Sequence, residues 1–100
     1  MTRETFTLRA KVWLYSHNES SWHFVSIPKR ESDYIRERFE SQKRGFGSIR
    51  VTVTLGTVVW KTSIFPDSKN TGTYFLPLKA EVRKKAKIEE GDTINFTIEI

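Results

Sequence analysis

A phenylalanine between two glycines lies in the stretch of this sequence whose residue types best suit ligand binding. In Arg44-Gly45-Phe46-Gly47-Ser48, glycine lets the backbone approach another group closely, and consecutive amides of such a turn bind anions. Further side chains on one face of the next predicted hairpin extend the site. The predicted ligand-binding residues are Arg44, Gly45, Phe46, Gly47, Arg50, Lys61 and Ser63. Alternatively, the turn only ends a helix and begins a strand.

Ser63 is a candidate nucleophile, but its sequence context lacks the features that activate a serine. No Gly-x-Ser-x-Gly elbow surrounds it, and its predicted cross-strand neighbour Arg50 is not a base. Catalysis would require His23 to approach from another strand with a carboxylate behind it. We therefore predict no catalytic residue, and an unrecognised small enzyme is the least favoured alternative.

The residues that usually bind metals are scarce in this chain. His17 and His23 are its only histidines, they lie outside recognised ligand spacings, and there is no cysteine. We therefore expect no metal site, no disulfide and no cofactor.

A short basic helix is the candidate for nucleic-acid binding, through Arg83, Lys84 and Lys87. The net charge of +5 permits attraction to phosphates. However, cations in the last turn also complement the helix dipole, and Glu81 and Lys85 form a stabilising i,i+4 pair. We expect weak, non-specific binding to duplexes, with a dissociation constant of about 10⁻⁴–10⁻⁶ M at physiological salt.

Alternating apolar and polar residues predict strands on either side of these candidates. Residues 6–14 and 94–100 alternate cleanly, with Trp13 on the outward side of the first strand. Residues 22–27 are apolar on both faces apart from His23 and Ser26, which predicts a strand that is central in the sheet or covered on both sides. A polar loop at residues 17–21 separates it from the first strand.

Residues 30–41 are predicted to form a helix, because Pro28 precedes them and Lys43, Arg44 and Gly45 mark the end. The buried side of this helix is predicted to carry Tyr34, Ile35 and Phe39.

Gly56-Thr57 separates two strand patterns by two residues and predicts a type II′ hairpin, because glycine occupies the first turn position. The pairing that follows places Leu55 opposite Val58 and Val53 opposite Trp60, on an apolar face. Trp60 is therefore predicted to be a core residue and not a ligand-stacking one.

A strand–Pro–Lys–helix–Gly–strand order occurs twice, once around Pro28-Lys29 and again around Pro77 and Gly91-Asp92. This order resembles the AbrB-like swapped-hairpin regulators, in which two chains each contribute one copy to a DNA-binding dimer. The resemblance implies nucleic-acid binding by a basic surface, but a chain that holds both copies does not need that dimer.

A second resemblance covers nearly the whole chain and rests on several motifs in order. They are Trp22-His23-Phe24-Val25, Pro28-Lys29, Arg44-Gly45-Phe46-Gly47-Ser48, Trp60-Lys61-Thr62-Ser63-Ile64-Phe65-Pro66-Asp67, Leu76-Pro77, Lys79 and Val82-Arg83-Lys84. The chain is similar to the family of the domain of unknown function numbered nineteen hundred and five. This resemblance implies a small double-split β-barrel of about six to seven strands with two short helices. It implies no activity.

One hundred residues suit one domain, residues 1–100, with 37% hydrophobic residues for its core. No apolar run reaches membrane-spanning length, so we expect a cytoplasmic protein. We predict a non-catalytic binding domain whose partner, a small molecule or a protein, is unknown.

Because one chain carries both copies of the repeated unit, we expect it to close its own barrel as a monomer. Light scattering at micromolar concentration should report a monomer, or a dimer that dissociates on dilution without unfolding. A dimer that loses secondary structure as it dissociates would show that strands are exchanged between chains.

Overall fold

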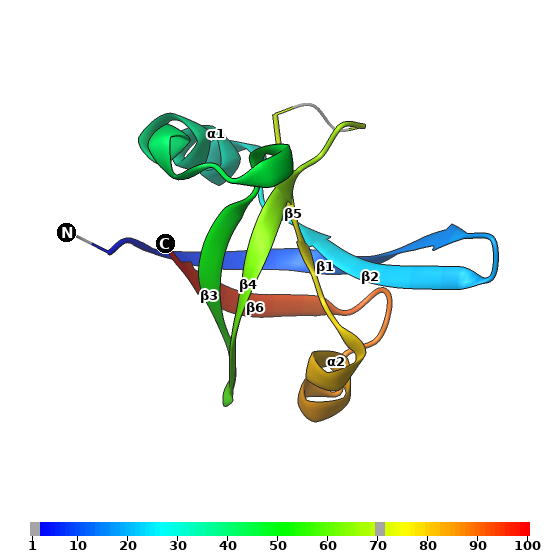
Figure 1. Ribbon diagram of the computed structural model, residues 1–100. Helices are drawn as coiled ribbons and strands as arrows, with labels where there is room; N and C mark the ends of the chain where they lie inside the picture. The colour runs from blue at the N-terminus through cyan, green and yellow to red at the C-terminus, as the bar shows by residue number, and fades with distance from the viewer. Residues whose placement is uncertain (1–2, 70–71) are drawn as a thin grey trace.

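The computed structural model describes residues 3–69 and 72–100, which form a closed six-stranded barrel in the order β1-β2-β5-β4-β3-β6 (Figure 1). All its strand pairs are antiparallel. The strands are β1 (Thr5–His17), β2 (Ser20–Ser26), β3 (Ile49–Leu55), β4 (Val58–Pro66), β5 (Tyr74–Pro77) and β6 (Thr93–Glu99). The helices are α1 (Lys29–Arg38), α2 (Ala80–Ala86) and the 3₁₀ turns η1 (Glu40–Gln42) and η2 (Gly45–Gly47).

The long strand β1 closes the barrel because it pairs with two different partners. Thr5 to Lys11 pair with β6, and Val12 to His17 pair with β2. Beyond the β1–β6 ladder, the Glu4 and Ile100 amides each donate to the other residue's carbonyl, at 3.1 and 2.9 Å. Residues 4 and 100 therefore lie side by side.

The β3–β4 hairpin confirms the predicted register, with Leu55 opposite Val58 and Val53 opposite Trp60. Gly56 has φ +61°, whereas Thr57 has no positive φ, as a type II′ turn requires. Trp60 consequently faces the core, where only 9% of its surface is exposed.

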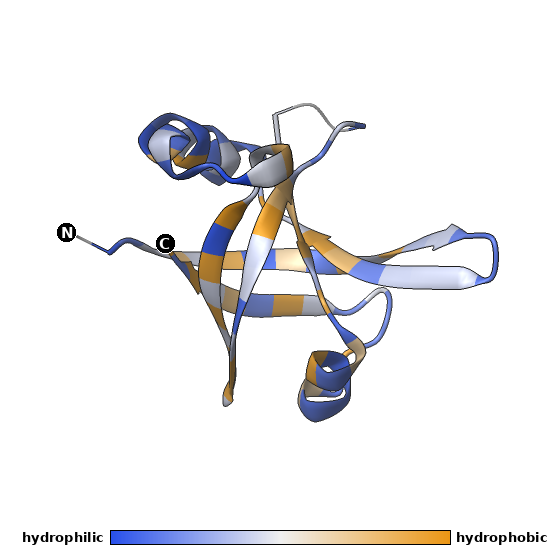
Figure 2. Ribbon diagram, in the orientation of Figure 1, coloured by the Kyte–Doolittle hydropathy of each residue, from blue (hydrophilic) through white to orange (hydrophobic). Residues whose placement is uncertain are grey.

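The barrel interior is filled by large aliphatic side chains from all six strands. The helices lie at its two ends (Figure 1), and hydrophobic residues recur along every strand (Figure 2). At one end, α1 contributes the buried Ile35, and at the other α2 contributes Val82. Fully buried Ser32 holds α1 in place, because its hydroxyl donates to the Ile27 carbonyl at 3.0 Å and accepts from the Tyr74 amide at 3.1 Å. This one side chain joins α1, the end of β2 and β5.

The predicted helix at residues 30–41 is shorter than expected, since α1 ends at Arg38 and η1 follows. Ile35 and Phe39 are buried as predicted, but the burial predicted for Tyr34 is wrong. Tyr34 is 46% exposed, and its hydroxyl donates to the Glu4 carboxylate at 2.6 Å. The ring lies at the margin of the core, and its hydroxyl reaches Glu4, just before β1.

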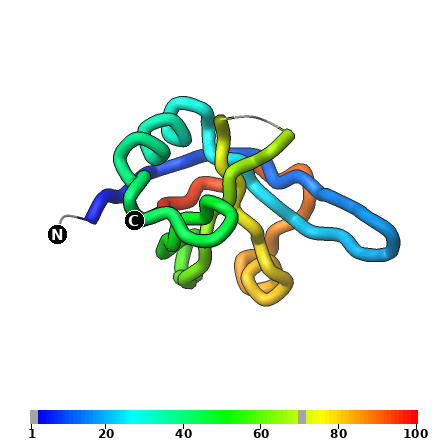
Figure 3. The backbone as a smooth tube through the Cα atoms, turned by 45° about the horizontal axis from the view of Figure 1, so that its top comes forward, coloured from blue at the N-terminus to red at the C-terminus, as the bar shows by residue number. Residues whose placement is uncertain are grey.

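The prediction of a loop at residues 17–21 is also wrong, because β1 ends at His17 and β2 begins at Ser20, so only two residues separate the strands. His17 pairs with Ser20, and Asn18, at φ +58°, makes the tight turn between them. The β1–β2 hairpin therefore projects beyond the barrel in both views (Figures 1 and 3).

The prediction of a small β-barrel with two short helices is confirmed. A strand–helix–strand order occurs twice, as β2–α1–β3 and as β5–α2–β6, while the AbrB-like resemblance stays a prediction. Within residues 3–69 and 72–100, no helix is long and apolar enough to cross a membrane.

We expect Trp60→Ala to lower the free energy of unfolding by roughly 3–5 kcal/mol, as for other large core aromatics. Urea denaturation measures this. The adjacent Val59 is 61% exposed on the outer face, so Val59→Ala is a control that should change stability by less than about 0.5 kcal/mol. An equally small effect at Trp60 would contradict its role in the core.

Candidate binding site

A row of aromatic side chains crosses the outer face of the barrel over β1, β2, β5 and β4. The Trp13 and Phe24 ring centroids lie 4.9 Å apart, Phe24 and Phe75 lie 4.8 Å apart, and Phe75 and Phe65 lie 5.7 Å apart. The strand pairs Trp13 with Phe24 and Phe65 with Phe75 place these rings side by side. The Trp13 indole N–H donates to the Ser26 hydroxyl at 3.0 Å, which fixes its orientation.

The row continues onto the projecting hairpin and forms the floor of a groove of about 640 Å³. Tyr15 and Trp22 pair across the hairpin with ring centroids 5.8 Å apart, and both are exposed. The Lys69 ammonium lies 5.1 Å from the centroid of the Tyr15 ring. We call this feature the aromatic groove, lined by Trp13, Tyr15, Phe24, Phe46, Phe65, Lys69 and Phe75.

Phe46 lies at the rim of the aromatic groove, with an unusual backbone conformation and an exposed side chain. Its backbone has φ +61° and ψ +19°, in the left-handed region, and its side chain is 95% exposed. The predicted turn around it is folded onto itself, because the Gly47 amide donates to the Arg44 carbonyl and the Ser48 amide to the Gly45 carbonyl. A Cβ on Gly47 would lie only 3.1 Å from Pro66, so this glycine allows the turn to sit against β4.

The cations among the predicted ligand-binding residues come together beside this turn. Arg44 and Arg50 line one shallow depression, and Arg50 and Lys61 line the next. Ser63 pairs with Arg50 on the same outward face. We call Arg44, Arg50 and Lys61 the basic strip. In the described part of the chain these three form no ion pair, whereas Lys43 next to them is paired with Glu40 at 2.6 Å.

The structure separates the two residues of the hypothetical Ser–His pair. Ser63 lies on the outward face of β4, whereas His23 pairs with Leu14 and lies on the inward side of β2. Among residues 3–69 and 72–100, no group of three or more metal-ligating side chains is close enough to hold an ion.

The predicted nucleic-acid-binding residues lie elsewhere, on and just after α2. The Arg83 Nε donates to the Leu78 carbonyl at 3.0 Å, so its side chain turns back toward β5. Lys84 and Lys87 are exposed, and Lys87 ends the helix with φ +56°. Because α2 and the Gly45–Gly47 turn lie at opposite ends of the barrel, these cations and the Arg44 turn do not form one patch (Figure 1).

Sequence reasoning missed the aromatic groove. Of the two alternatives predicted for residues 22–27, β2 is central, between β1 and β5, but it is not covered on both faces. Trp22 is 45% exposed, and Phe24 is only partly buried, by its aromatic neighbours. The alternation in β1 does place Trp13 and Tyr15 outward, which was the available signal. The alternation does not indicate which strands are neighbours in the sheet, and the groove depends on those neighbours.

A model of the family described as domain of unknown function DUF1905 matches residues 8–98. No curated protein matches the chain.

We expect His23 to make the stability of the fold depend on pH. Burial, and then the positive charge of Arg83, lower the pKa of its imidazole. The unfolded chain therefore binds this proton more readily, and stability present at neutral pH should decline as the pH falls below about 6.5. We expect the melting temperature to fall between pH 7.5 and pH 5, and His23→Asn to reduce that fall. His17→Asn, in the exposed hairpin, is the control; an equal effect of both variants would contradict the assignment.

Proposed function

The chain belongs to the DUF1905 family, whose description names no activity, and we propose from its geometry that it is a non-catalytic binding domain for short single strands of nucleic acid. The strand would lie in the aromatic groove, and its phosphates would meet the basic strip. The observation that carries this proposal is the exposure of the Phe46 ring, which lines the aromatic groove and lies two residues from Arg44 of the basic strip.

The left-handed backbone of Phe46 and the exposure of its ring are both unfavourable, and we find no contact within the described chain that offsets their cost. A bulky residue in the left-handed region costs about 1–3 kcal/mol, and such strain is concentrated at functional sites. The ring also leaves nearly all its apolar surface in water, although burying a phenylalanine contributes about 1.5–3 kcal/mol. A flat ligand that covered the ring would recover this contribution.

The aromatic groove suits bases because every base presents a flat π-face. Stacking on an aromatic side chain contributes about 1–3 kcal/mol per base and tolerates any sequence. The exposed rings of the groove are Tyr15 and Phe46, while Phe65 and Phe75 contribute to its floor. Paired bases in a duplex offer only their edges to a protein, so this surface favours a single strand.

The basic strip supplies the electrostatic part of such binding. Arg44, Arg50 and Lys61 have no carboxylate partner in residues 3–69 and 72–100, so phosphates need not displace one. By contrast, Lys29 and Arg36 of α1 share the Asp33 carboxylate. If each of the three cations meets a phosphate, the logarithm of the affinity should fall with the logarithm of salt concentration with a slope of about −2.

Fluorescence anisotropy with a labelled oligonucleotide of about eight nucleotides tests the proposal. We expect the single strand to bind more tightly than the matching duplex, and Phe46→Ala to weaken binding by about fivefold to 150-fold, the loss of one stacked base. Val59→Ala, an exposed apolar residue outside the groove, should leave the affinity unchanged.

Charge controls separate the basic strip from general attraction. Lys61→Gln should weaken binding and make the salt slope shallower, whereas Lys84→Gln on α2 should have little effect. Phe46→Ala should unfold at the same or a higher temperature than the unchanged protein, because the side chain buries little. Equal affinity for the duplex, or full affinity in Phe46→Ala, would overturn the proposal.

A further inference from the structure

A second cavity, of about 320 Å³, opens at the end of the barrel that α2 covers. It exists because β5 pairs with β4 only through Phe65–Phe75 and Pro66–Tyr74, and then leaves the barrel at Pro77 to enter α2. The stretch of β4 near Trp60 and Thr62 therefore borders a gap. We call this cavity the end pocket; the residues that matter for its chemistry are Trp22, His23, Trp60, Thr62, Lys79 and Arg83.

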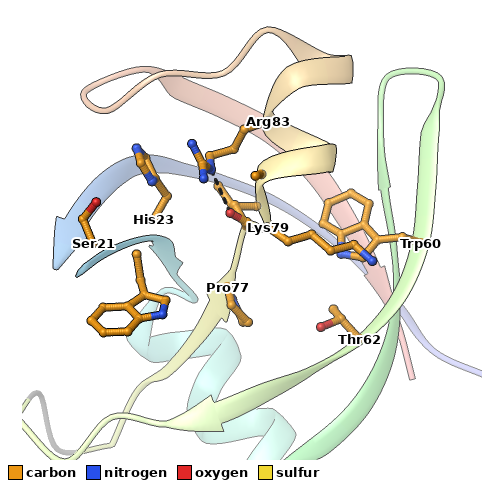
Figure 4. Close-up of a pocket in the computed structure, with 10 residues that line it drawn as sticks. Ser21, His23, Trp60, Thr62, Pro77, Lys79 and Arg83 are labelled. Atoms are coloured by element: carbon orange, nitrogen blue, oxygen red, sulfur yellow. Dashed lines mark hydrogen bonds between the residues drawn. The ribbon is translucent and has the colours of Figure 1, made fainter. Parts of the chain in front are cut away.

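Figure 4 shows how these side chains are arranged. Trp60 and Thr62 form one wall and His23 lies on the opposite wall, while Lys79 extends between them toward Trp60. The Arg83 side chain descends from α2 on the side of His23. The pocket thus has a cation on each side, Arg83 near His23 and the end of Lys79 near Trp60.

Both cations are available to a ligand. The Nε of Arg83 donates to the Leu78 carbonyl, which orients the guanidinium and leaves its two terminal nitrogens without a hydrogen bond to the described chain. Neither Lys79 nor Arg83 forms an ion pair within residues 3–69 and 72–100. An oriented, unpaired guanidinium is suited to bind a carboxylate or a phosphate, and the Lys79 ammonium adds a second positive charge to the same pocket.

His23 adds an independent sign that the end pocket is incomplete. Its Nδ1 is buried without a hydrogen-bond partner, the one such side-chain atom found in the part of the chain described. The His23 carbonyl accepts from the Leu78 amide at 2.9 Å, which holds the residue against the segment that leads into α2. A buried polar atom without a partner destabilises a protein, so a group that reaches it would be favoured.

We infer that the end pocket binds a small organic anion, a carboxylate or phosphate monoester with one flat ring. The anionic group would meet Lys79 and Arg83, and the ring would lie against Trp60. The volume is at the lower end of ligand pockets, which suits a single-ring compound. This site is separate from the aromatic groove, and it does not depend on nucleic-acid binding.

Nuclear magnetic resonance titration can locate the ligand, because the three tryptophans report on different places. Trp60 and Trp22 report on the end pocket, and Trp13 reports on the aromatic groove. The probes are phenyl phosphate, benzoate and inorganic phosphate. We expect phenyl phosphate or benzoate to shift the Trp60 indole and His23 imidazole signals to saturation, without moving those of Trp13 and His17.

Comparison of the probes separates the parts of the ligand. Inorganic phosphate should bind at least about tenfold more weakly than phenyl phosphate, since it has no ring to contact Trp60. A preference for benzoate or for phenyl phosphate identifies the anionic group. Equal binding of inorganic phosphate, shifts confined to Trp13, or no saturable shift at about 10 mM of any probe would overturn the inference.

Matched charge variants complete the test. Arg83→Gln and Lys79→Gln should each weaken the better probe by about tenfold, while Lys84→Gln, the next residue on α2, should leave it unchanged. Lys79 is exposed, so its variant tests the site even if Arg83→Gln folds poorly. Phe46→Ala should not alter this binding. Equal losses in Lys79→Gln and Lys84→Gln would overturn the inference, since they would indicate general charge attraction.

Discussion

The change of partner along β1 is the constraint on which the rest of the structure depends. Its first half pairs with β6 and its second half with β2, so a single strand closes the barrel. Because side chains alternate between the faces of a strand, the same register that buries Val12 turns Trp13 outward. Closure of the core and display of the aromatic groove are therefore two results of one pairing.

The short strand β5 helps to shape both of the surfaces for which we propose binding. Where β5 lies between β2 and β4, it inserts Phe75 between Phe24 and Phe65 and makes the aromatic row continuous. Where it ends at Pro77, which cannot donate to a further ladder, the two neighbouring strands separate and the end pocket opens. A longer β5 would extend the ladder across this gap.

The sequence predicted the features that local chemistry determines. Gly56 defined the hairpin turn, and the register of β3 and β4 followed from it residue by residue. The aromatic groove was beyond reach because Trp13, Phe24 and Phe75 come from three strands whose order the sequence does not state. The burial of Tyr34 was predicted wrongly for a related reason. The apolar residues of a helix do not indicate how far the barrel core extends across the face of that helix.

The ladder between Glu4 and Ile100 makes the chain almost a ring. The amide of each residue already donates to the carbonyl of the other, so a covalent link between the ends would span a gap that the fold has nearly closed. Joining ends that are held together constrains the unfolded chain far more than the folded one, because only the former had freedom to lose. A covalent link between residues 4 and 100 is therefore a modification that this barrel can accommodate without touching the aromatic groove or the end pocket, and new ends could open at the Gly56 turn.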